Sequence, residues 1–208
     1  MDMALVLVAM IEGKVSICAT EMLESMRTSH RPTRAEVADV AGAVRQGFGA
    51  VMLSAETATG YDPINAVTAM ARICEANESH DGHKSFADAH PTESAVGAAT
   101  AALAQRTGAA SIIALTYSGY SSEILSACRP GAQIIAATPS QETARRLRLY
   151  WGVTPLICQR NIDMTVAVDD AFNAALDAGL VQFNELVVVC ASRENIRSAA
   201  DTIWVHNA

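Results

Sequence analysis

Short apolar runs separated by segments of helical length are the feature of this sequence that most constrains its fold. Residues 111–116 (SIIALT), 133–138 (QIIAAT) and 185–191 (ELVVVCA) are apolar over nearly their whole length. Each run has the length and composition of a strand that is buried on both faces. Strands that alternate with helices in this way predict a largely parallel sheet covered on both sides, which is the α/β class.

The second half of the chain carries the complete version of this pattern. Further strands are predicted at 152–158 and 202–207, and helices at 92–107, from the YSGYSS turn through Ala127, at 139–150 and at 163–178. The last strand follows its predecessor without a clear helix, so it is expected to be an antiparallel edge strand. About five strands are enough to close the layers of a domain at 92–208.

The first half has only two predicted strands, at 14–20 and 49–54, with helices at 31–47 and 62–79. Thr33 and Glu36 have the spacing of a capping box at the start of the first helix. Two strands and their helices cannot bury both faces of a sheet. Residues 1–79 are therefore expected to be a segment of a larger structure, joined to the second half by a polar linker at 80–91 (HDGHKSFADAHP).

The apolar run from Met3 to Ile11 (MALVLVAMI) has no polar face. It is too short to span a bilayer, and no membrane association is expected. Two interpretations stay open for it. It is either a segment buried in a core or an exposed patch, and an exposed patch predicts self-association.

Composition excludes several function classes. The formal net charge is −7 with no basic stripe, so nucleic acid is not an expected partner. The 5 cysteines include no C-x-x-C pair, which is typical of a reduced, cytoplasmic protein. The cysteines and histidines are dispersed, and no metal site of the chain's own is predicted.

The first candidate site lies where the two strands of the first half end. Thr20 follows one strand, and Ser54 and Glu56 follow the other. Reactive groups collect at the carboxyl ends of parallel strands, where a hydroxyl relays a proton and a carboxylate accepts one. The alternative is that these residues are ordinary turn and cap residues.

The second candidate site is the loop LTYSGYSSE, between a strand and a helix. Its candidate residues are Thr116, Ser118, Gly119, Ser121 and Ser122. Free amides at a helix start, together with hydroxyls, form an anion pocket. The alternative is a well-capped turn that binds nothing.

Particular stretches resemble one enzyme family. ICATEMLESM, RPTRAEVADVAGAV and AVMLSAETATG resemble the last two βα units of the catalytic barrel of pyruvate kinase. TYSGYSSEI, RPGAQIIAATPSQETARRLRLYWGVTPL and GLVQFNELVVV resemble the C-terminal α/β domain of that enzyme. The resemblance implies a partial TIM-barrel segment followed by a three-layer α/β domain with a mostly parallel five-stranded sheet.

The resemblance also implies a function in glycolysis, the transfer of a phosphoryl group from phosphoenolpyruvate to ADP with Mg²⁺ and K⁺, which gives pyruvate and ATP. By position, Thr20 matches the barrel threonine at the substrate, Ser54 the serine of the proton-relay region, and Glu56 the acid two residues later. The Thr116–Ser122 loop matches the loop that takes the phosphate of a sugar-phosphate effector in regulated members. A homo-oligomer, a tetramer in the family, or a partner chain is implied.

The sequence departs from the family pattern in ways that bear on activity. Ala55 replaces a glycine, Thr59 replaces a lysine that helps to hold nucleotide phosphate, and Glu21 replaces a glutamine. The catalytic lysine and the magnesium ligands of the family, with their G-D-L-G motif, are absent from this sequence. Phosphoryl transfer depends on such cations, so the lone chain is expected to be inactive. The alternatives are a regulatory module that senses a phosphorylated metabolite or joins a full-length kinase subunit, and a degenerate remnant.

Overall fold

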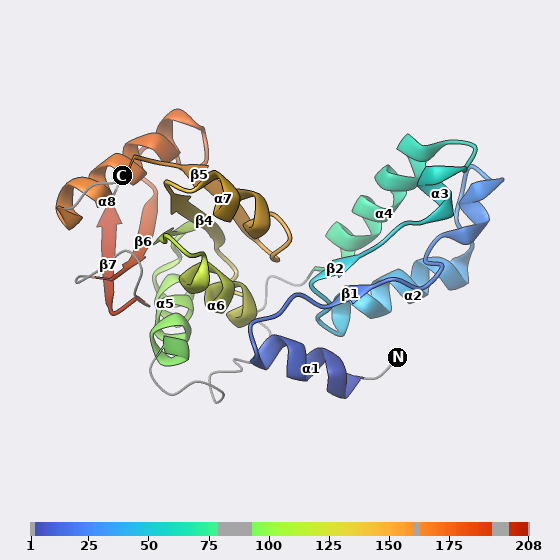
Figure 1. The fold of residues 1–208 in the computed structure, drawn as a ribbon, viewed down its shortest axis with the longest axis horizontal. Helices are drawn as coiled ribbons and strands as arrows, with labels where there is room; N and C mark the ends of the chain where they lie inside the picture. The colour runs from blue at the N-terminus through green and yellow to red at the C-terminus, as the bar shows by residue number, and fades with distance from the viewer. Residues whose placement is uncertain (1–2, 79–92, 160–162, 193–199, 208) are drawn as a thin grey trace. The chain divides into compact units, whose positions relative to one another are not determined.

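The computed structural model describes residues 3–78, 93–159, 163–192 and 200–207, and these are coloured in Figure 1. The chain divides into two compact units. The first comprises Met1–Met10 and Lys14–Ser79, and the second comprises Ile11–Gly13 and His80–Ala208. The predicted linker at 80–91 lies outside the described residues.

The described part of the second unit forms a five-stranded sheet in the order β5-β4-β3-β6-β7. All neighbouring strands are parallel except β6 and β7, which are antiparallel, as predicted. The strands are β3 (Ser111–Leu115), β4 (Gln133–Thr138), β5 (Val153–Ile157), β6 (Leu186–Ala191) and β7 (Thr202–Asn207). The helices are α5 (Glu93–Thr107), α6 (Tyr120–Cys128), α7 (Gln141–Leu147) and α8 (Met164–Asp177).

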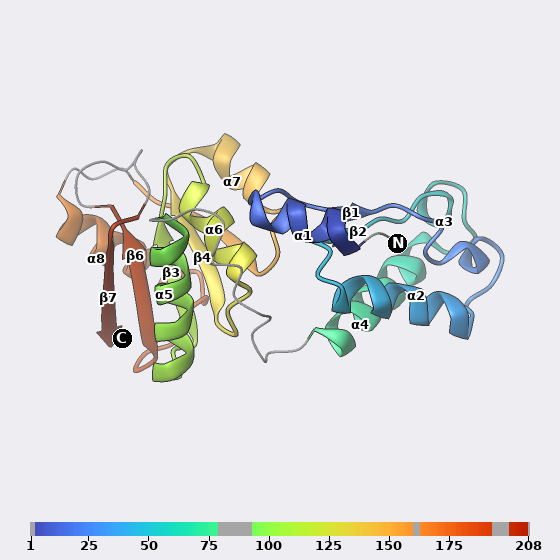
Figure 2. The same ribbon diagram turned by 90° about the horizontal axis from the view of Figure 1, so that it is seen from below.

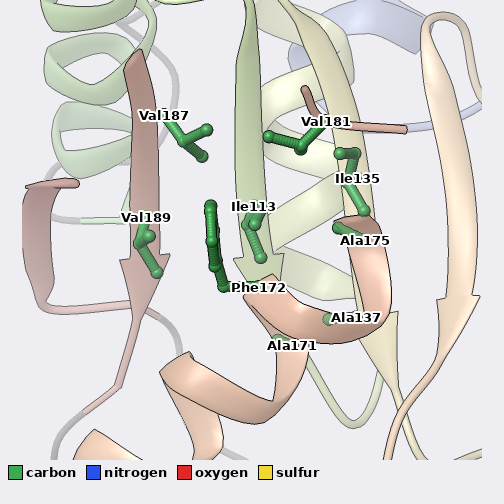
Figure 3. Packing of buried hydrophobic residues seen from close by; sticks show 9 residues of the cluster. All are labelled: Ile113, Ile135, Ala137, Ala171, Phe172, Ala175, Val181, Val187 and Val189. Carbon is green, nitrogen blue, oxygen red and sulfur yellow. The ribbon is translucent and has the colours of Figure 1, made fainter. Parts of the chain in front are cut away.

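Helices lie on both faces of the sheet (Figures 1 and 2). Alternate residues of the central strands belong to two separate cores, one on each face. On one face, Ile113 and Val189 pack with Phe172 of α8, as Figure 3 shows. On the other face, Ile112 and its neighbours pack with Leu125 of α6 and Ala104 of α5. Because both faces of these strands are buried, their sequences are continuous apolar runs and do not alternate between apolar and polar residues.

The strand order reverses direction at β3. From β3 the chain moves outward through α6 to β4 and through α7 to β5, and then α8 returns it to β6 on the opposite side of β3. In open α/β sheets, ligands bind beside the carboxyl ends of the strands at such a switch point. The Thr116–Gly119 turn follows the carboxyl end of β3, so the second candidate site lies beside this switch point.

Strand β5 is one edge of this sheet, and Pro155 lies at its centre. Ile134 donates its N–H to the carbonyl of Gly152, and Cys158 donates its N–H to the carbonyl of Thr138. In a parallel pair, every second residue of a strand directs its backbone N–H and C=O toward the neighbouring strand. Gly152 and Cys158 face β4 in this way, so Pro155, which is an odd number of residues from each, has its nitrogen pointing away from β4. The proline therefore removes a donor from the free edge and none from the ladder.

The first unit contains a parallel pair of strands, β1 (Ile17–Cys18) and β2 (Ala50–Val51). Both are shorter than the predicted 14–20 and 49–54, because each strand pairs only with the other in the described residues and has no second neighbour to extend it. The other elements are α1 (Met3–Ile11), η1 (Glu24–Arg27), α2 (Arg34–Arg45), α3 (Ala55–Ala58) and α4 (Pro63–Asn77). The sequence did not predict η1 and α3, which are single turns.

The predicted capping box at the start of α2 is present. Thr33 accepts a hydrogen bond from the N–H of Glu36, and the Glu36 carboxylate accepts one from the N–H of Thr33. The same carboxylate also accepts bonds from the N–H and the hydroxyl of Ser25, at 2.7 and 2.5 Å. One side chain thus caps the helix and ties the η1 segment to it.

The core of the first unit is built mainly from sulfur-containing and small residues. Its buried members are Cys18, Met22, Leu23, Met26, Val40, Ala43, Ala66 and Met70. Helix α1 buries Val6 but leaves Leu5 70% and Val8 57% exposed. Of the two interpretations of the N-terminal run, this exposure agrees with the apolar patch.

Candidate functional site

The first candidate site lies past the ends of β1 and β2. The register pairs Ile17 with Ala50 and Cys18 with Val51, and the N–H of Met52 donates to the carbonyl of Cys18 at 2.9 Å. Because the strands are parallel and in register, the segments that follow β1 and β2 begin at the same end of the strand pair. Thr20 and Ser54, which are both exposed, therefore follow neighbouring strand ends, as the sequence predicted.

Among the described residues, the Thr20 hydroxyl has sulfur atoms as its hydrogen-bond partners. Its Oγ1 lies 3.4 Å from Met22 Sδ and 3.8 Å from Cys18 Sγ. Sulfur is a poor hydrogen-bond partner compared with oxygen. An exposed hydroxyl held in this way keeps most of its hydrogen-bonding capacity for a bound molecule.

Glu56 is placed very differently from Thr20. Its side chain is only 1% exposed. Oε1 accepts the N–H of Leu23 at 3.0 Å, and Oε2 accepts the N–H of Ser54 at 2.7 Å. The carboxylate therefore joins the segment after β1 to the segment after β2.

Two opposing effects act on the pKa of Glu56. Burial raises the pKa, but the hydrogen bonds from backbone N–H groups outweigh burial and hold it below the ordinary range. Hydrogen bonds to the charged form keep the carboxylate ionised and leave it with little tendency to take up a proton. This geometry is that of a positioning residue rather than of a free general base.

Gly60 closes the loop that carries Ser54 and Glu56. A Cβ at this position would overlap the carbonyl oxygen of Glu56. Thr59 of this loop and Glu21 of the segment after β1 are both exposed. The Thr59 hydroxyl donates to the carbonyl of Ala55 at 3.3 Å.

The second candidate site is the turn between β3 and α6. Gly119 is the N-cap of α6, with a φ of 93° that favours glycine. Its N–H donates to Thr116 Oγ1 at 2.9 Å, and the N–H of Tyr120 donates to Ser118 Oγ at 3.4 Å. The turn is thus held by its own hydroxyls, which is the arrangement of a well-capped helix start.

The predicted residues of this turn differ in exposure. Ser118 is exposed, whereas Thr116, Ser121 and Ser122 are 3%, 6% and 0% exposed. Among the described residues, Ser122 Oγ has no hydrogen-bond partner. The structure therefore brings the predicted hydroxyls together but presents only one of them at the surface.

Arg146 of α7 is a residue of this site that sequence reasoning missed. Its Nη2 donates to the carbonyl oxygen of Ser118 and to Glu123 Oε1, the latter at 2.9 Å. A Cβ on Gly119 would lie 2.8 Å from the same nitrogen. In the sequence, Arg146 belongs to the basic run ARRLR, which resembles an ordinary solvated helix face, so no local signal distinguishes it.

In the part of the chain that the structure describes, no three His, Cys, Asp or Glu side chains gather as metal ligands. No helix in the same residues combines the length and the apolar character needed to cross a bilayer.

Two family models match the chain. The model of the pyruvate kinase α/β domain matches residues 94–206, and the model of the pyruvate kinase barrel domain matches residues 2–67. The first of these covers the five strands of the sheet except Asn207, and the second covers both Thr20 and the Ser54–Glu56 segment. The chain belongs to the pyruvate kinase family.

Curated pyruvate kinases from several bacteria are similar over most of the chain. One from Agrobacterium vitis is 43% identical over 185 residues, which make 86% of this chain and 39% of the relative. One from Methylorubrum extorquens is 45% identical over 181 residues, 84% of this chain and 37% of the relative. Pyruvate kinase 2 of Synechocystis is 40% identical over 192 residues, 91% of this chain and 32% of the relative. The chain thus spans well under half the length of these pyruvate kinases.

The residues present do not fit a magnesium site of the pyruvate kinase kind. Glu56 is the acidic residue among the candidate residues of the first site, and both of its oxygens already accept backbone N–H groups. Mg²⁺ needs carboxylate oxygens that are open to a hydrated ion. No step is therefore assigned to a metal on this chain.

Proposed function

We propose that this chain supplies the last two βα units of the barrel and the C-terminal α/β domain of a pyruvate kinase, at 1–79 and 92–208. The complete enzyme transfers a phosphoryl group from phosphoenolpyruvate to ADP in the cytoplasm, as a homo-oligomer, with Mg²⁺ and K⁺ held by groups that this chain does not supply. The observation that carries the proposal is the alignment of Thr20 and Ser54 past neighbouring ends of a parallel strand pair, inside the match to the barrel domain.

In this proposal the three residues of the barrel segment have separate roles. Thr20 offers its hydroxyl to the substrate, because sulfur atoms are its neighbours and leave it free to bind. Ser54 lies in the proton-relay region at the adjacent strand end. Glu56 positions the two segments through the N–H groups of Leu23 and Ser54 and takes no proton itself.

The lone chain is proposed to be inactive. A (β/α)8 barrel takes eight strands, and the matched barrel segment of this chain contributes β1 and β2. Phosphoryl transfer is catalysed mainly by cations placed around the transferred group. Thr59 and Glu21, in place of a lysine and a glutamine, both make this end of the segment less positive.

A complementation assay tests the proposal. The purified chain is assayed for pyruvate formation from phosphoenolpyruvate and ADP, alone and after co-expression with the remaining barrel part of the Agrobacterium vitis enzyme. We expect no activity alone and recovered activity in the complex, with a large loss for Thr20→Ala. Activity of the lone chain that disappears in Thr20→Ala would contradict the claim of inactivity. Recovered activity that Thr20→Ala and Ser54→Ala leave unchanged would contradict the assigned roles.

The second candidate function is the sensing of a phosphorylated metabolite by the Thr116–Ser122 loop. It is supported by a helix start at the topological switch point, the exposed Ser118 and the nearby guanidinium of Arg146. Helix N-termini and guanidinium groups both favour phosphate. Glu123 opposes this function, because its carboxylate already pairs with Arg146.

Isothermal titration with glucose 6-phosphate tests this function, and glucose serves as the uncharged control. We expect binding of the phosphorylated sugar alone and a loss of roughly ten-fold in affinity for Arg146→Gln. Arg145→Gln, in the adjacent and exposed position of the same helix, is the matched control. Equal binding of glucose, or an equal loss in both variants, would count against a phosphate site at this loop.

A further inference from the structure

The sheet of the second unit has a pocket beside its antiparallel edge. Helix α5 packs against β6 and β7 on one face, whereas on the opposite face α8 packs against β3 and β5. On this face, Phe172 of α8 also reaches His206 of β7. A pocket of about 370 Å³ lies there, between the first half of α8 and the strands β6 and β7.

The floor and walls of this pocket are mainly apolar. Met164 and Val168 line it from α8, and Val189 and Trp204 line it from the sheet. Val189 and Trp204 are cross-strand partners, so the indole continues the buried face of the sheet toward its edge. The volume and the apolar walls fall within the range of small-molecule sites, which is roughly 300–1,000 Å³.

Three polar side chains line the same pocket. Thr165 and Asp169 lie one turn apart on α8, and His206 lies on β7 with its ring 4.7 Å from that of Phe172. Among the described residues, the lining includes one acidic residue, Asp169, and no lysine or arginine. The Asp169 carboxylate would repel an anionic ligand and attract a cationic group.

We propose that the pocket between α8 and β7 binds a small aromatic amine, with its ring against Trp204 and Met164 and its ammonium group at Asp169. The indole gives the ring a flat apolar surface, and the methionine thioether makes a favourable contact with an aromatic edge. The carboxylate selects the charge of the ligand. This site is separate from the Thr116–Ser122 loop, whose chemistry favours anions.

The proposal is tested by ¹H–¹⁵N NMR titration of the full chain with phenethylamine. The readout is the indole N–H signal of Trp204, and the indole of Trp151, assigned with Trp151→Phe, is the internal reference. The anion 3-phenylpropionate, which carries a similar ring with the opposite charge, is the matched ligand. We expect phenethylamine to shift the Trp204 signal progressively and 3-phenylpropionate to leave it in place.

Two variants distinguish the effect of the pocket carboxylate on ligand binding from the effect of the net charge of the helix. Asp169→Asn is expected to weaken phenethylamine binding about three-fold, the size of a solvent-exposed charge pair. Asp170→Asn removes the same charge from the next residue, which is exposed and does not line the pocket, and it should leave the affinity unchanged. A Trp204 signal that phenethylamine does not move, equal shifts with 3-phenylpropionate, or equal losses in the two variants would each overturn the proposal.

Discussion

The carboxylate of Glu56 accepts the backbone N–H of Leu23 at 3.0 Å across 33 positions of sequence. Its second oxygen accepts the N–H of Ser54 at 2.7 Å. A buried carboxylate that accepts hydrogen bonds from two backbone donors holds together the loops that follow two different strands. The geometry of the Thr20 and Ser54 segments therefore depends on a side chain that need not touch any substrate.

Glu56→Gln is expected to destabilise the first unit by about 2 kcal/mol, because the amide loses the charge that strengthens these bonds and leaves a backbone donor poorly satisfied. Hydrogen exchange measured by mass spectrometry in urea reports the change in peptides that cover Leu23 and Ser54. Glu24→Gln is the control, since it removes only an exposed ion pair with Arg27 and should cost less than about 1 kcal/mol. Equal effects of the two substitutions would show that the hydrogen bonds of Glu56 stabilise the first unit no more than an exposed ion pair does.

Acid should weaken the first unit selectively. Burial raises the pKa of Glu56 and Glu36, but their hydrogen bonds outweigh it and the pKa of each carboxyl is lowered on folding. A carboxyl with a lowered folded pKa stabilises the protein fully above its unfolded pKa, and the effect is lost as pH falls through the folded value. Stability measured by urea unfolding should therefore be level above about pH 5 and fall below the ordinary glutamate range of about 4.3. The fall should be shallower in Glu56→Gln, and an unchanged pH profile in this variant would show that Glu56 does not cause the fall.

Two glycines of the first unit should respond oppositely to alanine. A Cβ on Gly60 would overlap the Glu56 carbonyl oxygen, so Gly60→Ala forces the loop apart and should cost several kcal/mol. On Gly42, inside α2, the nearest contact of a Cβ would be Gln46 Nε2 at 3.9 Å, so Gly42→Ala should stabilise by about 0.5–1 kcal/mol. Thermal unfolding of both variants checks the pair. A tolerated Gly60→Ala would mean that the loop has another conformation of similar energy.

The cysteines of the second unit should react slowly with thiol reagents. Burial raises the pKa of Cys128 and Cys190 to about 11 each, from an ordinary value near 9. The reactive thiolate is then about 100-fold scarcer at pH 8, and burial hinders the reagent as well. A chromogenic disulfide reagent should label these thiols much faster in denaturant than in buffer. Rapid labelling of Cys190 in the folded chain would show that β6 opens readily.

The sequence predicted the second unit well because its local and global signals agree. Ile112 and Ile113 face opposite sides of the sheet and both are buried, which gives the continuous apolar run that identifies a central strand. The antiparallel β7 was predicted because the sequence shows no clear helical pattern before it. The capping box of Thr33 and Glu36 was predicted because it needs only residues three apart.

The first unit and the details of both candidate sites were less predictable. The lengths of β1 and β2 depend on neighbouring strands, which no local pattern reveals. The bond from Leu23 to Glu56 and the placement of Arg146 beside Ser118 are contacts between residues far apart in sequence. The same holds for the burial of Ser122, which the sequence predicted to be a hydroxyl of an anion pocket. Tertiary packing decides such features, and periodicity does not report them.

Because of Pro155, the two edges of the five-stranded sheet differ in how readily they pair with a strand from another molecule during misfolding. A strand that docks on β5 from another molecule meets a missing N–H at its centre, so the cross-β ladder that amyloid requires is interrupted there. Strand β7 has no proline, so it offers no such interruption. Intermolecular strand addition in a partly unfolded preparation should therefore start at one side of this sheet only, and a single imino acid sets that direction.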